Sequence, residues 1–224
     1  MNDFPNKFSQ CVDDPQQCIN GLNNLLLNSY LSPWEDQRDY ANRRGRDRAE
    51  GRIRTRTEIT GIVLHSTGRH HFRDSEGWVS HIRANFIIPH SGIILYCHDV
   101  LEERASSGRL NRTTVPVEFI GNFRMTNGNW FKRSLHAGHN NMPSDGQYRA
   151  GRRLIRFLKD CYGITEVWAH TQASQNREDC PGMDIWGNVG QWAIDQNILT
   201  EGDGSHLPGN PIPDQWRNPL PVGS

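Results

Sequence analysis

The pattern of hydrophobic and polar positions divides the chain near residue 59. Apolar residues between Gln16 and Leu31 recur at helical spacing, so we expect one amphipathic helix in an N-terminal extension, residues 1–58. The run Ile59 to His65 is short, apolar and β-branched, as in a buried strand, and it opens a main domain over residues 59–201. Residues 202–224 hold five of the twelve prolines and show little periodicity, which predicts an extended or disordered tail.

Three further strands are expected in the first half of the main domain. Residues Asn85–Pro89 and Ile93–His98 flank Ser91-Gly92 and are typical of a hairpin. Val115–Ile120 has strand character, but Pro116 lacks the amide that a central strand would use. We therefore expect this strand at a sheet edge or at a bulge.

The pattern changes to a helical period in the second half. Apolar residues recur every three or four positions after Ser144, which can cap a helix, and Gly163 follows its end. Glu166–Ala169 is a predicted strand that delivers His170 at its tip. Residues Ile185–Ile198 form a last predicted helix.

Charge and composition exclude several classes of partner. Lys plus Arg and Asp plus Glu each total 25, so no global field draws the chain to nucleic acid. An arginine-rich segment over residues 43–56 is diluted by acidic residues and is interpreted as a solvated helix or linker. No run approaches the roughly 20 apolar residues that span a bilayer, and Met1–Pro5 lacks the pattern of a signal peptide. Five cysteines leave at least one free thiol, and Cys180 is the candidate.

Three residues far apart in the sequence share the chemistry of a metal site. His65 ends a predicted strand, His170 follows another, and Cys180 lies in the loop Asp179-Cys180-Pro181-Gly182. Two imidazoles and a thiolate are donors that zinc prefers, and three protein donors leave one position open for water. Such a site is catalytic. Other candidate donors lie in polar, loop-like segments and are interpreted as structural or surface residues: His70, His71, His98, Asp99, His136 and His139.

The order of these motifs resembles that of a known family. The chain looks like the zinc-dependent N-acetylmuramoyl-L-alanine amidases of the second class, which include amidase-type phage lysozymes and the peptidoglycan recognition proteins. The resemblance covers roughly residues 59 to 199 and implies an α/β fold with a single central mixed β-sheet flanked by helices. It rests on His65-Ser66-Thr67, Asn85-Phe86-Ile87-Ile88, Ser91-Gly92, Thr114-Val115-Pro116-Val117-Glu118, Tyr162-Gly163-Ile164, His170 and Asp179-Cys180-Pro181-Gly182.

The resemblance implies roles for five residues. By position, His65, His170 and Cys180 bind Zn²⁺. Glu118 falls on a carboxylate that acts as general base in some members. Glu178 occupies the place where members often carry a lysine; it cannot stabilise an oxyanion as a cation would, but it could act as an acid or base if burial raised its pKa.

Other positions depart from the family pattern. Ala84-Asn85 replaces a pair that often ends in histidine, and Ala105-Ser106 replaces a common Trp-His pair. These changes affect the substrate groove and the proton donor, while the metal ligands are intact. Four tryptophans are candidates for a sugar or peptide groove, although core packing suits at least two of them: Trp78, Trp130, Trp168 and Trp186.

The reaction implied is hydrolysis of the amide between N-acetylmuramic acid and L-alanine in peptidoglycan, with Glu118 or Glu178 moving the proton. One alternative is a non-catalytic module of the same fold that binds peptidoglycan or muropeptides. Another is a metal-free hydrolase in which Cys180 attacks and His170 activates it.

The substrate also bears on location and partners. We expect a protein made in the cytoplasm without a signal peptide that acts on the cell wall after release or injection; cytoplasmic muropeptide recycling is the alternative. The N-terminal extension is a candidate docking segment for a secretion machine, an immunity protein or a phage component.

Overall fold

The computed structural model describes residues 34–38, 52–68, 83–128 and 142–218. The helix expected over residues 16–31 lies outside these ranges, as do Cys11, Cys18, Trp78, Trp130 and the histidines at positions 70, 71, 136 and 139. None of the helices in the described ranges could span a bilayer, because each is too short or too polar.

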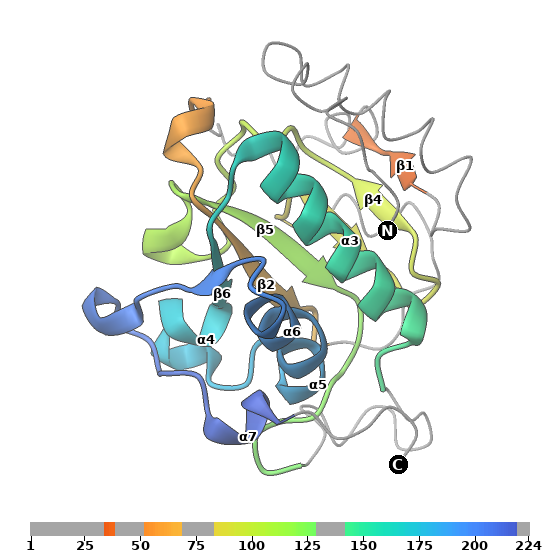
Figure 1. The fold of residues 1–224 in the computed structure, drawn as a ribbon, viewed down its shortest axis with the longest axis vertical. Helices are drawn as coiled ribbons and strands as arrows, with labels where there is room; N and C mark the ends of the chain where they lie inside the picture. The colour runs from red at the N-terminus through yellow and green to blue at the C-terminus, as the bar shows by residue number, and fades with distance from the viewer. Residues whose placement is uncertain (1–33, 39–51, 69–82, 129–141, 219–224) are drawn as a thin grey trace.

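A mixed β-sheet forms the centre of the molecule (Figure 1). Its strands lie in the order β1-β4-β3-β5-β2-β6-β7 within the described residues. All neighbouring pairs are parallel except β3 and β4, which form the predicted antiparallel hairpin. The single mixed sheet is therefore confirmed. The strands are β1 Trp34–Asp36, β2 Gly61–Ser66, β3 Phe86–Ile88, β4 Ile94–Tyr96, β5 Thr114–Phe119, β6 Glu166–Ala169 and β7 Thr200–Glu201.

Helices flank the sheet. The longest, α3 (Asp145–Tyr162), runs across it in Figure 1. Its start is fixed by a capping box in which the Ser144 hydroxyl accepts from the N–H of Gln147, and its end by Gly163 at φ +73°. The remaining helices are short: α4 His170–Ala173, α5 Met183–Ile185, α6 Trp192–Asp195 and α7 Asp214–Arg217, with 3-10 turns at Arg56–Glu58, Gly108–Leu110, Gln175–Arg177 and Gly204–His206.

The predicted C-terminal helix is interrupted. A π-helical segment, Trp186–Gln191, joins α5 to α6. The Trp186 ring is fully buried, and a Cβ atom at Gly190 would lie 2.7 Å from it. The large ring therefore packs against the helix's own backbone at a position that only glycine permits.

The expectation that the proline-containing strand lies at an edge is wrong. Strand β5 pairs with β3 on one side and β2 on the other. The carbonyl of Pro116 accepts from the N–H of Asn85 at 3.2 Å, so its nitrogen faces the same side, one step before β3 begins at Phe86. Pro116 therefore lies opposite residues that precede β3, and its lack of an N–H removes no hydrogen bond between β5 and β3.

The tail is not extended over residues 202–218. Trp216 is fully buried and Ile212 is 4% exposed, and both belong to the main hydrophobic core. The guanidinium of Arg217 pairs with the carboxylate of Glu201 on β7. A Cβ atom at Gly209 would lie 2.2 Å from backbone carbonyl oxygens of α4, so the chain passes directly against that helix. Hydrophobic periodicity could not predict this packing, because the segment contains several prolines and is largely non-helical.

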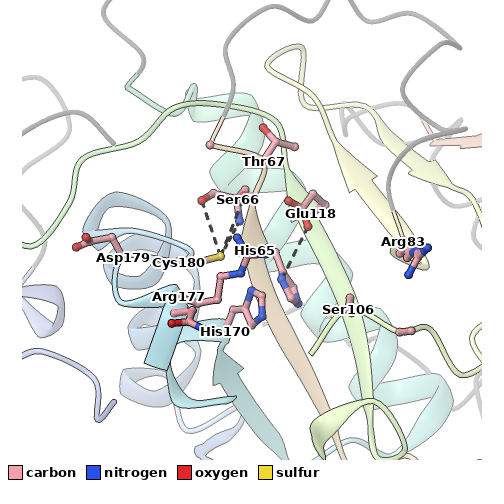
Figure 2. Close-up of a pocket in the computed structure, with 13 residues that line it drawn as sticks. His65, Ser66, Thr67, Arg83, Ser106, Glu118, His170, Arg177, Asp179 and Cys180 are labelled. Carbon is pink, nitrogen blue, oxygen red and sulfur yellow. Dashed lines mark hydrogen bonds and ion pairs between the residues drawn. The ribbon is translucent and has the colours of Figure 1, made fainter. Parts of the chain in front are cut away.

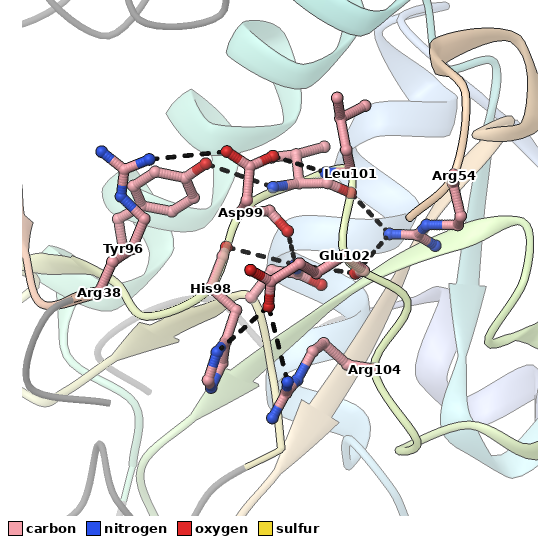
Figure 3. Close-up of polar contacts among 10 residues, drawn as sticks. Arg38, Arg54, Tyr96, His98, Asp99, Leu101, Glu102 and Arg104 are labelled. Atoms are coloured by element: carbon pink, nitrogen blue, oxygen red, sulfur yellow. Dashed lines mark hydrogen bonds and ion pairs between the residues drawn. The ribbon is translucent and has the colours of Figure 1, made fainter. Parts of the chain in front are cut away.

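The arginine-rich segment is not uniformly solvated. The side chain of Arg54 is only 1% exposed and lies beneath the loops that precede β5 (Figure 3). Burial lowers its pKa to about 10, so the guanidinium still carries its charge at neutral pH. Its terminal nitrogens donate to the backbone carbonyl oxygens of Val100, Glu102, Asn111, Arg112 and Thr114.

The N-terminal extension also meets the sheet edge. Strand β1 lies in parallel register beside β4. Arg38, which follows β1, is 3.5 Å from the carboxylate of Asp99 and lies over the Tyr96 ring at 4.6 Å (Figure 3). Strand β1 of the expected N-terminal extension is therefore part of the central sheet.

Replacing Arg54 by alanine should destabilise the fold by about 3 to 5 kcal/mol, because several buried carbonyl groups would lose their only charged donor. Urea unfolding followed by circular dichroism measures the loss. Arg109→Ala removes an arginine at an exposed position; it serves as the control and should stay within about 0.5 kcal/mol of the parent. Equal urea midpoints for the two variants would contradict a stabilising role for the hydrogen bonds of Arg54.

Candidate active site

Parallel strand register places three of the predicted site residues side by side. Strand β2 lies between β5 and β6, and His65 is paired in register with Glu118. Leu64 is paired with Ala169, so His170 follows at the same edge of the sheet as the first residue of α4. The two imidazole rings lie with their centroids 4.2 Å apart. Side chains meet here because parallel strands end at the same sheet edge.

A loop after α4 brings the cysteine to the two histidines (Figure 2). The N–H of Thr171 donates to the carbonyl of Cys180 at 2.9 Å, which fastens the loop to α4. The Cys180 sulfur accepts from the N–H of Ser66 at 3.4 Å. The donor atoms of His65, His170 and Cys180 all lie within 4.8 Å of one another, and all three side chains are buried.

Hydrogen bonds orient the ring of His65. Its Nε2 lies 2.8 Å from the hydroxyl of Ser107, and the N–H of Ser107 donates to the Asn111 side chain at 2.6 Å. The other ring nitrogen, Nδ1, lies 3.9 Å from a Glu118 oxygen. Nδ1 is therefore the nitrogen that remains for a ligand. The role of Ser107 was not anticipated, although it directly follows the divergent pair Ala105-Ser106.

Burial keeps both imidazoles neutral. It lowers the pKa of His170 to about 4, and the nearby charge of Arg177 acts in the same direction. The pKa of His65 lies well below its ordinary value, first because of burial and then because of His170 and Arg177. Neutral imidazole is the form that binds a metal.

The thiol experiences the opposite effect. Burial raises the pKa of Cys180 to about 12, and the neighbouring Glu118 contributes, whereas the N–H of Ser66 lowers it. In this environment the sulfur carries a proton unless a cation compensates its charge. The buried sulfur therefore lacks the low pKa that marks a reactive thiolate.

The donor set fits a zinc ion. Two neutral imidazoles and one thiol match the ligand types of zinc sites with an open position. The three donor atoms lie within 4.8 Å of one another, so they would have to move only slightly closer together to form zinc bonds of about 2.0 to 2.3 Å. A divalent cation would also offset the cost of a thiolate in this buried place. Within the described ranges these three residues are the grouped donors, and His98, although buried, is not one of them.

The two candidate carboxylates lie in different places. Glu118 is at the wall of the pocket with a 14% exposed side chain, and burial raises its pKa to about 8 while Arg177 opposes the shift. Glu178 is exposed and lines a neighbouring hollow together with Asn210. Only Glu118 thus shares the pocket of the three donors.

Arg177 is a site residue that the sequence analysis missed. It lies in the 3-10 turn Gln175–Arg177, is exposed, and reaches over the three donors in Figure 2. Its charge acts on His65, His170, Cys180 and Glu118 alike. A basic residue three positions before Cys180 was visible in the sequence, but the family pattern directed attention to position 178.

The three donors and Glu118 open into a pocket of about 310 Å³. The tryptophans expected at a groove are absent from its described lining, because Trp168 and Trp186 are buried in the core. The lining residues are His65, Ser66, Thr67, Gly68, Arg83, Ala105, Ser106, Glu118, His170, Asn176, Arg177, Asp179 and Cys180.

The fold and this pocket belong to a recognised class of protein. The model of the Amidase_2 family, described as N-acetylmuramoyl-L-alanine amidase, matches residues 55–183, which is more than half of the chain. The chain therefore belongs to the N-acetylmuramoyl-L-alanine amidase family, a family of cell-wall amidases, as the motif order predicted. No curated protein sequence matches it.

Solved structures share the fold at low sequence identity. Peptidoglycan recognition protein SA from Drosophila has a TM-score of 0.54 and 16% identity, covering 72% of this chain and 92% of its own. The corresponding protein from Apis mellifera has a TM-score of 0.52 and 17% identity, covering 72% and 95%. The endolysin amidase LysCS from Clostridium intestinale URNW has a TM-score of 0.48 and 18% identity, covering 65% and 88%. The recognition proteins show the shared fold, whereas membership of the amidase family rests on the family match.

Proposed function

We propose that the protein is a zinc-dependent amidase that hydrolyses the bond between N-acetylmuramic acid and L-alanine in peptidoglycan. The observation that carries this proposal is the buried group His65, His170 and Cys180, with the Glu118 carboxyl beside it in the same pocket. When bound there, zinc supplies Lewis-acid activation of the amide carbonyl and of a water, and its charge favours the carboxylate form of Glu118.

Glu118 is assigned the proton transfer. Its carboxyl group lines the pocket and lies close to the donors, so it can take a proton from the attacking water and pass it to the leaving amine of L-alanine. Burial supports this role, because a carboxyl group with a raised pKa can hold a proton at neutral pH and return it. Glu178 is not assigned the step, since its side chain faces solvent on another hollow.

Arg177 is assigned the charge stabilisation that Glu178 cannot supply. Its guanidinium lies at the pocket, and the structure gives it no carboxylate partner among the described residues. A cation there can bind the developing negative charge on the amide oxygen or a carboxylate of the stem peptide. In this proposal Arg177 supplies the positive charge that family members often place one residue later, at the position of Glu178.

Two other functions receive less support. A non-catalytic peptidoglycan-binding module does not need a complete N₂S donor set with an adjacent buried carboxyl group. A metal-free cysteine hydrolase needs a thiolate close to a base, whereas the Cys180 sulfur has a raised pKa and its hydrogen bonds run to Ser66 instead of His170.

The substrate places the site of action at the cell wall. We propose that the protein, made in the cytoplasm, reaches the wall by release or by injection. The residues that precede β1 are proposed as the docking segment for a secretion machine, an immunity protein or a phage component, since β1 and Arg54 are already engaged by the domain.

Metal binding is tested with Co²⁺ as a spectroscopic substitute for zinc. The wild-type protein should bind one equivalent and show a thiolate-to-cobalt charge-transfer absorption, because Cys180 is a ligand. Cys180→Ser should lose that absorption. Cys161→Ser removes another buried thiol outside the site and should keep it. An unchanged spectrum in the Cys180 variant would remove the sulfur from the ligand set.

Replacement of Glu118 by glutamine should lower kcat about 10²- to 10⁴-fold, because the amide keeps the size of the side chain but cannot exchange a proton. Release of free stem peptide from purified peptidoglycan, followed by mass spectrometry, measures the rate. Zinc content should stay at the wild-type level, and Glu35→Gln, exposed on β1, should retain full activity. If wild-type protein loaded with zinc binds peptidoglycan and releases no stem peptide, the binding-module function is correct instead.

Loss of the Arg177 charge should weaken catalysis less severely. Arg177→Ala is expected to reduce kcat/KM about ten- to a hundredfold, and Arg177→Lys should restore part of it, because the charge matters more than the fork geometry at an exposed site. Arg149→Ala, exposed on α3, is the matched control. Wild-type kcat/KM and salt dependence in Arg177→Ala would exclude the residue from the reaction.

A further inference from the structure

A second hollow, of about 550 Å³, adjoins the catalytic pocket. Asp179 lines both, so the two spaces meet at the residue directly before Cys180. We call this space the tail hollow, because residues beyond the family match at 55–183 form one of its walls. Its lining residues are Thr126, Asn127, Glu178, Asp179, Asn210, Pro213 and Gln215.

The walls of the tail hollow are firmly built. The N–H of Asn210 donates to the carbonyl of Thr171 at 2.8 Å, which ties the tail to α4. Trp216 is fully buried and its indole N–H donates to the hydroxyl of Thr126 at 3.1 Å. The N–H and hydroxyl of Thr126 donate in turn to the carboxylate of Asp179, at 2.9 and 3.1 Å. One connected set of hydrogen bonds therefore joins the tail, the loop after β5 and the cysteine loop.

The chemistry of the lining suits hydroxyl and acetamide groups. Side-chain amides come from Asn127, Asn210 and Gln215, and the described lining contains no lysine or arginine. The amide nitrogen of Asn210 has no hydrogen-bond partner and is shielded from solvent, so this side chain must rotate before it can donate to a ligand in the hollow. Glu178 contributes an exposed carboxylate, an acceptor for hydroxyl groups.

Charge separates the two ends of the combined cavity. The catalytic pocket is lined by the cations Arg83 and Arg177 together with the acidic Glu118 and Asp179. The charged residues in the described lining of the tail hollow, Glu178 and Asp179, are both acidic, so arginine occurs only at the catalytic end. In the substrate, the stem peptide carries free carboxylates, and the muramic carboxyl is neutral because it forms the amide. A carboxylate-bearing peptide would be repelled by Glu178, but a neutral sugar would not.

We propose that the tail hollow binds the neutral glycan strand that continues from the N-acetylmuramic acid residue. This inference rests on the proposed amidase function, and it assigns the stem peptide to the arginine-bearing end. The C-terminal residues 202–218 then determine the preference for glycan length, because they supply a wall that the matched family region does not contain.

The test compares two substrates that differ only in sugar length. One is N-acetylmuramic acid carrying the stem peptide, and the other is a tetrasaccharide of alternating N-acetylglucosamine and N-acetylmuramic acid carrying the same peptide. Wild-type kcat/KM should be higher for the tetrasaccharide. The double variant Asn210→Ala/Gln215→Ala should lose about five- to tenfold on the tetrasaccharide and less than twofold on the short substrate, since one good polar contact amounts to about 1 kcal/mol.

Controls separate binding from folding. The double variant Gln196→Ala/Asn218→Ala removes the same two residue types from exposed positions outside the hollow and should keep the length preference. Glu178→Gln changes a lining residue outside the tail, and should also reduce the preference while leaving thermal unfolding unchanged. Equal losses on both substrates, or a preference that survives both hollow variants, would overturn the proposal.

The outcome is distinguishable from failure of the amidase function. If zinc-loaded wild-type protein cleaves neither substrate, calorimetric titration with the peptide-free tetrasaccharide replaces the kinetic measurement. Binding by the wild type that is lost in Asn210→Ala/Gln215→Ala supports the hollow as a glycan site. Absence of binding by the wild type, or binding only of a stem peptide with a free amine, overturns it.

Discussion

The register of β2 between two parallel neighbours is the constraint on which the site depends. Pairing with β5 sets Glu118 beside His65, and pairing with β6 sets His170 one residue past the matched pair Leu64 and Ala169. A shift of one residue in either ladder would turn a side chain to the opposite face of the sheet. The core fixes that register, because alternate residues of the same strands pack beneath α3.

Burial then determines the chemical character of the site. It suppresses protonation of both imidazoles and disfavours the Cys180 thiolate, so the three donors are neutral and poorly solvated. Such a group gains more from a divalent cation than a solvated group does, since no water competes for the ligands. The same burial raises the pKa of Glu118. One physical cause therefore gives the site three neutral donors suited to a divalent cation and a carboxyl group with a raised pKa.

Segments outside the family match complete the domain. Arg54 fastens the loops that precede β5, and Trp216 fills the core beside the π-helical segment. Neither residue belongs to the three donors. Arg54 holds the loop that contributes Ala105 and Ser106 to the catalytic pocket, and Trp216 holds the loop after β5, which lines the tail hollow. Composition did not indicate these contacts, because it reflects how residues prefer solvent and not which distant segments touch.

The sequence alone determined the order of the elements, the hairpin, the capped helix α3 and the three candidate donors, because these depend on local periodicity, capping residues and motif order. It misjudged Pro116, Arg54 and the tail, whose surroundings are built from distant segments. It also left Glu118 and Glu178 as equal candidates and overlooked Arg177. Only the tertiary structure separated them, because pocket membership depends on how the turn after α4 directs successive side chains, and no local pattern encodes that direction.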